Sequence, residues 1–246
     1  MLFRSAHEVG HTLGLRHNFK ASTIHSIEEL HDESVSRTEG LSSSVMDYNP
    51  VNIAPEGMQQ GAYYQTALGP YDYWAIEYAY RTFDGESETS EVAALKKIAR
   101  KGTSPDLPYG TDEDAFWWTQ GIDPSAARWD MGDDPFAYYS NRLNLSRELW
   151  RNLEDTFEKK GARYQKLRRV FNWGFSPYWR DSHNLAKHIG GIYHHRDHVG
   201  DPDGRVPMVP VPADQQRRAL ALLVEHVFSA DAFAWDAELL NKLAPE

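Results

Sequence analysis

The chain has 246 residues, 41% of them hydrophobic, which is enough to bury one good core or two smaller ones without cross-links. A formal charge of -10 at pH 7 argues against a nucleic-acid partner, because phosphate binding needs a basic face. Cysteine is absent, so disulfides and thiolate metal sites are excluded, and any metal must be held by His, Asp, Glu or Tyr. No apolar run is long enough to span a bilayer, and the residues before position 7 contain no stretch typical of a signal peptide.

A histidine motif follows immediately and reads H-E-x-x-H-x-x-G-x-x-H from His7 to His17. His7 and His11 are four residues apart, so on a helix they project from one face and can share an ion. Gly14 suits the end of that helix, because glycine enters the left-handed conformation without a Cβ penalty, and the turned chain can deliver His17. Three neutral imidazoles leave the fourth tetrahedral position open to water, as a catalytic zinc site requires.

Glu8 has the position of a general base in this motif. It lies beside a ligand but at a different helical angle, where its carboxylate can reach the zinc-bound water instead of the metal. It would take the proton as water attacks a carbonyl and pass it to the leaving amine. The alternative is a surface helix that is rich in histidine by chance, but the glycine and the third histidine at fixed offsets make that coincidence improbable. We therefore expect one catalytic Zn²⁺, held by His7, His11 and His17.

The segment 19–44 is polar, and we expect a connecting loop with one short helix near Ile27 to His31. His25 and His31 have no ligand spacing to a partner, so we place both on the surface. A longer helix is expected from Pro70 to Tyr80, because proline is acceptable in a first helical turn and apolar side chains recur at helical spacing. The stripe of this helix consists of Tyr71, Trp74, Ala75 and Tyr78.

Between these elements, Met46 follows His17 by 29 residues. The zinc motif, this methionine and the helix from Pro70 to Tyr80 together resemble the metzincin metallopeptidases, most closely the bacterial extracellular Met-zincin group. The resemblance implies that Met46 lies in a tight turn beneath the zinc site, as a soft apolar floor. It also places Tyr48 where astacin-like and serralysin-like metzincins carry a tyrosine, whose phenol approaches the metal or hydrogen-bonds the tetrahedral intermediate. The alternative for Tyr48 is an aromatic residue packed in a loop.

From about Phe83 onward the pattern is mainly helical. Helical spacing and capping residues predict four further helices, over residues 90–101, 136–160, 164–171 and 212–228. Sustained period-two alternation is absent, so no substantial sheet is expected. The expected fold is mainly α: the C-terminal part of a metzincin-type catalytic domain over 1–82 (zinc helix, methionine turn and closing helix), followed by a helical C-terminal domain over 83–246.

Two acidic clusters, one at Asp112–Asp114 and one at Asp130, Asp133 and Asp134, could bind Ca²⁺, which prefers oxygen ligands. Neither cluster matches a defined calcium loop, and helix caps with solvated turns explain both more simply. The run from His194 to His198 raises the possibility of a second metal site. Adjacent histidines point in different directions and the nearby glycines indicate a loop, so we favour a mobile surface loop there.

The resemblance also sets an expectation for what surrounds the zinc helix. Metzincin catalytic domains include a twisted sheet upstream of that helix, and its edge strand pairs with extended substrate. Only six residues precede His7, so we expect this sheet to be missing and the chain to be N-terminally truncated. The ligand set would be complete while the substrate cleft is half built, and an upstream domain would complete the cleft.

The leading hypothesis is a zinc-dependent endopeptidase that hydrolyses peptide bonds of a peptide or protein substrate, with Glu8 as general base and Tyr48 as an assisting residue. The competing hypothesis is a non-catalytic zinc-binding remnant or helical interaction module without a complete cleft. The resemblance further implies an extracytoplasmic location, in the periplasm, at the cell surface or in the medium.

Overall fold

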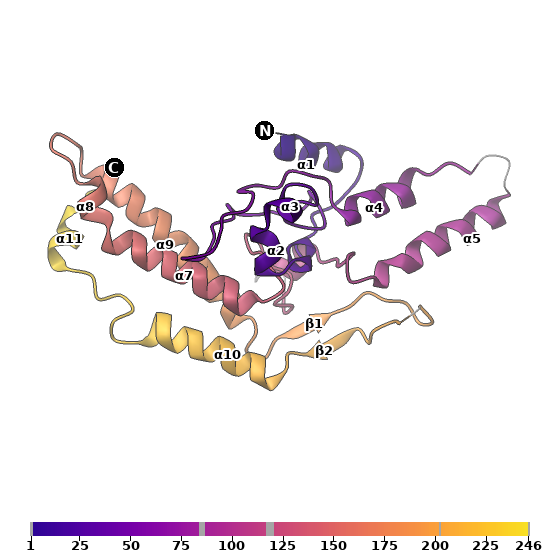
Figure 1. Cartoon of the computed structure of the whole chain (residues 1–246). Helices are drawn as coiled ribbons and strands as arrows, with labels where there is room; N and C mark the ends of the chain where they lie inside the picture. The colour runs from indigo at the N-terminus through magenta and orange to yellow at the C-terminus, as the bar shows by residue number, and fades with distance from the viewer. Residues whose placement is uncertain (1, 84–86, 117–120, 202, 246) are drawn as a thin grey trace. The chain divides into compact units, whose positions relative to one another are not determined.

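The computed structural model describes residues 2–83, 87–116, 121–201 and 203–245, and these are mainly helical, as expected (Figure 1). The chain divides into two compact units, one formed by Met1–Pro135 with Gly191–Pro210 and the other by Phe136–Gly190 with Val211–Glu246. The expected division into a partial catalytic domain over 1–82 and a helical domain over 83–246 is a different kind of division from these compact units, and it stays a prediction. Among the described helices, none combines the length and apolar character that crossing a membrane requires.

The first unit consists of short helices joined by long irregular segments. These helices are α1 (Leu2–Thr12), η1 (Ala21–Ile24), α2 (Ile27–His31), α3 (Glu33–Ser36), α4 (Pro70–Tyr80), α5 (Glu88–Ala99), η2 (Arg100–Thr103) and α6 (Asp112–Ala115). A hairpin completes the unit: β1 (Ile192–His194) pairs antiparallel with β2 (Met208–Pro210), and Tyr193 lies opposite Val209 (Figure 1). The described ranges contain no further strand, which agrees with the expectation of no substantial sheet.

Local sequence explains where these elements begin. The helices expected near Ile27 to His31 and from Pro70 to Tyr80 are confirmed, as α2 and α4. A capping box at Ser26 starts α2, because the Ser26 hydroxyl accepts from the Glu29 backbone N–H and the Glu29 carboxylate accepts from the Ser26 N–H. The helix expected over 90–101 begins earlier, because Ser87 and not Ser90 provides the cap of α5.

Two expectations about histidines in this unit are wrong. His25 and His31 are buried, with 6% and 5% of their surface exposed. The segment around Gly61 covers α2 closely: its backbone N–H donates to His31 Nδ1 at 3.4 Å, and a Cβ on Gly61 would lie 2.8 Å from the His31 Cα. His194, expected in a mobile loop, lies in strand β1. Long-range packing, which spacing along the chain does not encode, decides both outcomes.

The second unit is a helical bundle of α7 (Pro135–Arg151), α8 (Leu153–Phe157), α9 (Gln165–Ala186), α10 (Ala213–Leu223), the π-helix η4 (Val224–Phe228) and α11 (Ala237–Lys242). The single helix expected over 136–160 is divided at Asn152, and the one expected over 164–171 continues to Ala186. Trp150 anchors the core: its indole N–H donates to the Phe171 carbonyl at 3.1 Å, and its ring lies 5.2 Å from those of Tyr178 and Trp235, centroid to centroid.

Candidate metal centre

Helix α1 and the turn that follows it bring three imidazoles together. One ring nitrogen each of His7, His11 and His17 lie within 4.8 Å of one another. α1 ends at Thr12, and Gly14 then takes the left-handed conformation with a φ of +86°, while the Leu15 N–H donates back to the Gly10 carbonyl at 3.0 Å. This turn reverses the chain, so that His17 returns to the helix face that carries the other two histidines.

Each imidazole is oriented through its Nδ1 atom by a different segment. His7 Nδ1 lies 2.7 Å from the Val45 carbonyl oxygen, and His11 Nδ1 lies 2.9 Å from the Leu15 carbonyl oxygen. A carbonyl only accepts, so both rings donate from Nδ1 and keep the lone pair on Nε2. This tautomer is the one that a metal ligand binding through Nε2 needs.

The third imidazole is oriented by a carboxylate. His17 Nδ1 lies 2.9 Å from Asp112 Oδ1, in helix α6. The His17 Nε2 atom is buried and has no hydrogen-bond partner among the described residues. A buried nitrogen without a partner is costly, and coordination of a cation would satisfy it. The three residues therefore fit a zinc ion with three imidazole ligands.

The protonation of His7 also suits a ligand. Burial lowers the pKa of its imidazole, and the neighbouring His11 and His17 lower it further, against the Val45 carbonyl and the charge of Glu8, which raise it. The net pKa lies below the ordinary value, so the ring is neutral at pH 7. A neutral imidazole is the form that coordinates zinc.

Met46 lies directly against α1. Its side chain is fully buried, and its sulfur occupies the place that a Cβ on Gly10 would take. The Met46 carbonyl accepts from the Asn18 N–H at 3.0 Å, which ties the turn to the residue after His17. The methionine thus lies beside the helix turn that joins His7 to His11, as an apolar support of the site.

Asp72, at the start of α4, holds the methionine turn in place, a role that sequence reasoning missed. Its carboxylate accepts from the Ser44 hydroxyl at 2.6 Å, from the Val45 N–H at 2.9 Å and from the Gly69 N–H at 2.9 Å. Val45 is the residue whose carbonyl orients His7. Helix α4 therefore positions the imidazole of His7 through two intervening contacts.

Tyr48 lies beside two of the histidines. Its ring centroid is 4.7 Å from that of His17 and 5.4 Å from that of His7, and the ring stacks on Trp129 at 5.8 Å. Burial raises the pKa of its phenol, and the negative charges of Asp112 and Glu8 add to this, against Arg128. The phenol therefore stays protonated at neutral pH and can donate a hydrogen bond.

Glu8 is exposed on α1. Its negative charge raises the pKa of both the His7 imidazole and the Tyr48 phenol, so the carboxylate lies within electrostatic range of these two side chains. Solvent reaches it there, which suits a group that exchanges protons with water.

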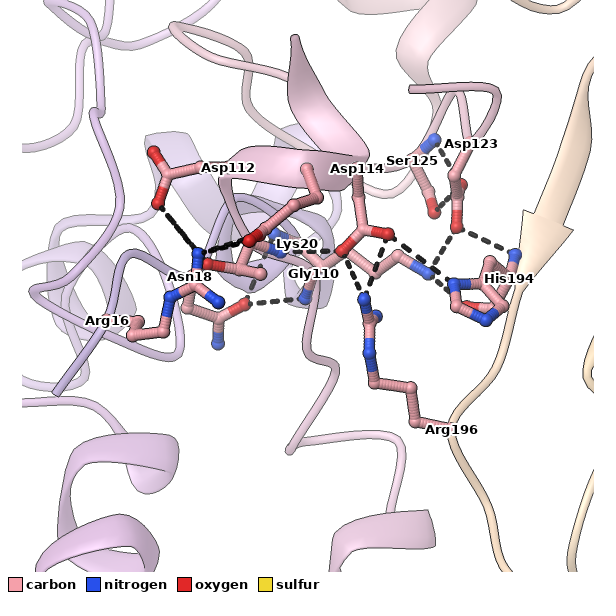
Figure 2. A network of polar contacts seen from close by, with 12 residues as sticks. Arg16, Asn18, Lys20, Gly110, Asp112, Asp114, Asp123, Ser125, His194 and Arg196 are labelled. Carbon is pink, nitrogen blue, oxygen red and sulfur yellow. Dashed lines mark hydrogen bonds and ion pairs between the residues drawn. The ribbon is translucent and has the colours of Figure 1, made fainter. Parts of the chain in front are cut away.

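The acidic cluster at α6 is tied to the zinc motif and to the hairpin (Figure 2). Arg16 donates to both carboxylate oxygens of Glu113, at 2.8 and 2.7 Å, and lies 3.6 Å from Asp112. Asp114 caps its own helix and accepts from Arg196 at 3.0 and 2.7 Å. Within the described ranges, one group of three or more His, Asp or Glu side chains lies close enough together to share an ion. This group is His7, His11 and His17, and it contains no carboxylate. Calcium binding therefore has no support.

Comparison with known proteins agrees with this geometry. A family model described as Met-zincin matches residues 1–245. No curated protein and no solved structure matches the chain. The family implies zinc binding, indicates a function of the zinc metallopeptidase type and suggests a peptide substrate. With nearly its whole length matched by that model, the chain belongs to the Met-zincin family.

Proposed function

We propose that this chain is a zinc-dependent endopeptidase in which His7, His11 and His17 hold one catalytic Zn²⁺. The observation that carries the proposal is that all three imidazoles are oriented through Nδ1, which leaves each Nε2 available, and that one ring nitrogen of each lies within 4.8 Å of the others. A structural zinc site closes its coordination with a fourth protein ligand. Within the described residues no fourth His, Asp or Glu joins this group, so one position is left for water and substrate.

The protein's own residues divide the chemistry of peptide hydrolysis. Zinc bound here would supply Lewis acidity and favour the deprotonation of water. Glu8 takes a proton from the attacking water and passes it to the leaving amine. Tyr48, protonated beside His17, donates a hydrogen bond to the oxyanion of the tetrahedral intermediate. Asp112 and the Val45 carbonyl hold two of the ligand rings at fixed angles, and Met46 supports the helix beneath them.

The finer assignments belong to the same proposal. We place the chain in the bacterial extracellular group, with an extracytoplasmic location and a peptide or protein substrate. Residues 1–82 represent part of the catalytic domain and residues 83–246 a helical domain, and an upstream domain supplies the sheet that completes the cleft.

One observation favours the second candidate, a non-catalytic zinc-binding remnant or helical interaction module. In the part of the chain that the structure describes, β1 and β2 are the only strands, and both pair with each other. The larger sheet whose edge strand would pair with a substrate is therefore not present among these residues, and backbone pairing is a main source of peptide affinity in such clefts.

The test is metal content of the purified chain, followed on the same sample by cleavage of casein. We expect one zinc per chain and cleavage that a chelator abolishes and added zinc restores. The Glu8→Gln variant should keep its zinc and lose cleavage, while Glu88→Gln on α5 serves as the matched control and keeps both. One zinc without cleavage supports the non-catalytic candidate. A folded chain without zinc at neutral pH contradicts both.

A further inference from the structure

The first unit contains a cavity of about 730 Å³ that takes no part in the metal centre. Its volume lies in the range of small-molecule sites, roughly 300 to 1,000 Å³. Its walls come from α4, from α5 with η2, from the segment 107–109, and from β1 with the loop that follows it. None of the three ligand histidines lines the cavity.

One part of the lining is a set of ordered aromatic rings. Tyr71 and Tyr109 stack at 5.7 Å with 6° between their planes, and Trp74 lies 5.6 Å from Tyr71. The Trp74 indole N–H donates to the Ile98 carbonyl at 2.8 Å, which fixes the indole. Rings held in this way offer a flat apolar body a surface that needs little reordering on binding.

The α5 side of the cavity supplies two cations. Lys96 and Arg100 line it, and their side chains form no ion pair or hydrogen bond with any described residue. Their charge is available to an anion from solution.

The hairpin side supplies two guanidinium groups with donors to spare. Arg196 binds Asp114 through Nη2, and Arg205 binds Asp197 through Nε and Nη2 at 2.8 Å each. The Nη1 groups of both arginines form no hydrogen bond with the described residues. Each carboxylate therefore fixes its guanidinium and leaves donors for a further oxygen ligand. Arg196 also lies over the Tyr109 ring, 5.5 Å from its centroid, which joins the cationic part of the lining to the aromatic part.

His195 also lines this cavity, and its pKa is lowered by the surroundings. Burial lowers the pKa of its imidazole, and the positive charges of Arg205 and Lys20 lower it further, against Asp197 and Asp123. The ring is neutral at pH 7 and can donate one hydrogen bond.

We propose that this cavity binds an organic anion, with its carboxylate or phosphate group among Lys96, Arg100 and Arg196 and its flat apolar body against Tyr109 and Trp74. The site is separate from the metal centre, so the proposal stands whether or not the chain cleaves peptides. Carboxylates and phosphates share the oxygen acceptors that guanidinium and ammonium groups recognise, and the rings select for an apolar body over inorganic phosphate.

The test is calorimetric titration of the full chain with phenyl phosphate, phenylacetate and the neutral analogue phenylacetamide. Zinc binds such anions directly, so each titration is made on zinc-loaded and on chelator-treated protein. We expect saturable binding of one anion per chain, equal in both preparations, and no binding of phenylacetamide over the same concentrations. Comparison of the two affinities shows whether the cavity prefers a phosphate or a carboxylate group. Absence of saturable binding, equal binding of the neutral analogue, or binding that requires zinc while the chelator-treated chain remains folded overturns the proposal.

A matched pair of variants locates the site. Lys96→Glu and Lys97→Glu make the same charge change at neighbouring, exposed positions of α5, but only Lys96 lines the cavity. We expect Lys96→Glu to weaken binding by about tenfold or more, and its combination with Arg100→Glu to weaken it further, because charge-assisted hydrogen bonds are lost and repulsion is introduced. Lys97→Glu should leave affinity within a factor of about two. Equal weakening by Lys96→Glu and Lys97→Glu overturns the assignment to this cavity.

Discussion

Asp112 Oδ1 lies 2.9 Å from His17 Nδ1, although 95 positions separate the two residues. The neighbouring Arg16 binds Glu113, the next residue of the same short helix. Two successive residues of the zinc motif are therefore held by two successive carboxylates of α6 (Figure 2 shows Arg16 beside Asp112). The third imidazole of the candidate site depends on this contact for its orientation.

Asp112→Ala should weaken zinc binding by about 10- to 100-fold, because removing the partner of a ligand histidine frees both its tautomer and its ring orientation. Competition between the protein and a chelating dye measures the change. Asp106→Ala, at an exposed position of the segment before α6, is the control and should leave zinc affinity unchanged. An Asp112→Ala chain with native affinity would show that the Asp112 contact does not orient the ligand.

Tyr48→Phe separates the two roles considered for this residue. If the phenol donates to the tetrahedral intermediate, the variant should keep its zinc and lose about 100-fold in kcat, with KM little changed, because one oxyanion donor is removed. Steady-state cleavage of a fluorogenic peptide gives both constants. An aromatic residue that only packs would tolerate the change at full kcat, as we expect for the exposed control Tyr63→Phe.

Gly10 and Met46 should behave as a coupled pair in stability measurements. Gly10→Ala places a methyl group where the Met46 sulfur lies, and overpacking of this kind costs about 1–3 kcal/mol. Met46→Ala costs about 2–5 kcal/mol, since the side chain is fully buried. In the double variant the new methyl group enters the space that Met46 leaves. The double variant should therefore lose less unfolding free energy than the sum of the losses of the two single variants. Additive losses in urea unfolding would mean that the two side chains do not compete for one space.

Lys20 and Asp123 form a buried ion pair at 2.5 Å, with side-chain exposures of 7% and 1% (Figure 2). Lys20→Met leaves the Asp123 charge without its cation, which should cost about 3–5 kcal/mol of unfolding free energy. Lys20→Met combined with Asp123→Asn removes the stranded charge and should recover part of that loss. Thermal or urea unfolding of the three chains decides the matter. A double variant less stable than Lys20→Met contradicts this account.

The second unit should carry a pH dependence that originates at Asp181. Burial raises the pKa of this carboxyl from 3.8 to about 6, against the charges of Arg180 and Arg142. The native state therefore binds the proton more tightly than the unfolded chain, so the contribution of Asp181 to stability is fully present below pH 4 and falls as the pH rises towards 6.

Asp181→Asn removes this titration. Between about pH 4 and pH 7, the wild-type chain should lose unfolding free energy relative to the variant, as urea midpoints at each pH would record. Taking the difference between the two chains cancels the other groups that titrate in this range. Parallel curves would place the native pKa of Asp181 near its unfolded value.

What the sequence could predict is local. His7, His11 and His17 lie within one short segment, a helix and the turn that follows it, so their spacing alone indicates that they can meet. The start of α4 likewise follows from Pro70 in its first turn. The end of α1 near Gly14 depends on the backbone conformation of that one residue, so it can also be predicted without knowledge of tertiary contacts.

What the sequence could not predict depends on distant segments. Asp72 lies in the first turn of α4, where any carboxylate complements the helix dipole, yet its carboxylate also holds the turn around Val45. Asp112 reads as a helix cap or calcium ligand, and no spacing rule links it to His17. His31 is buried because the segment around Gly61 packs against it, 30 residues further along the chain. In each case a contact across many positions decides the role.

The three partners that fix the imidazoles, the carbonyls of Val45 and Leu15 and the carboxylate of Asp112, come from three separate stretches of chain. Zinc affinity therefore depends on more than the presence of the motif: it also depends on whether the methionine turn packs against α1 and whether α6 packs against Arg16 and His17. Metal binding and tertiary assembly of this unit become one linked equilibrium. Zinc should raise the melting temperature of this unit, and a substitution that weakens the packing of either segment should first be detected as a lower affinity for zinc.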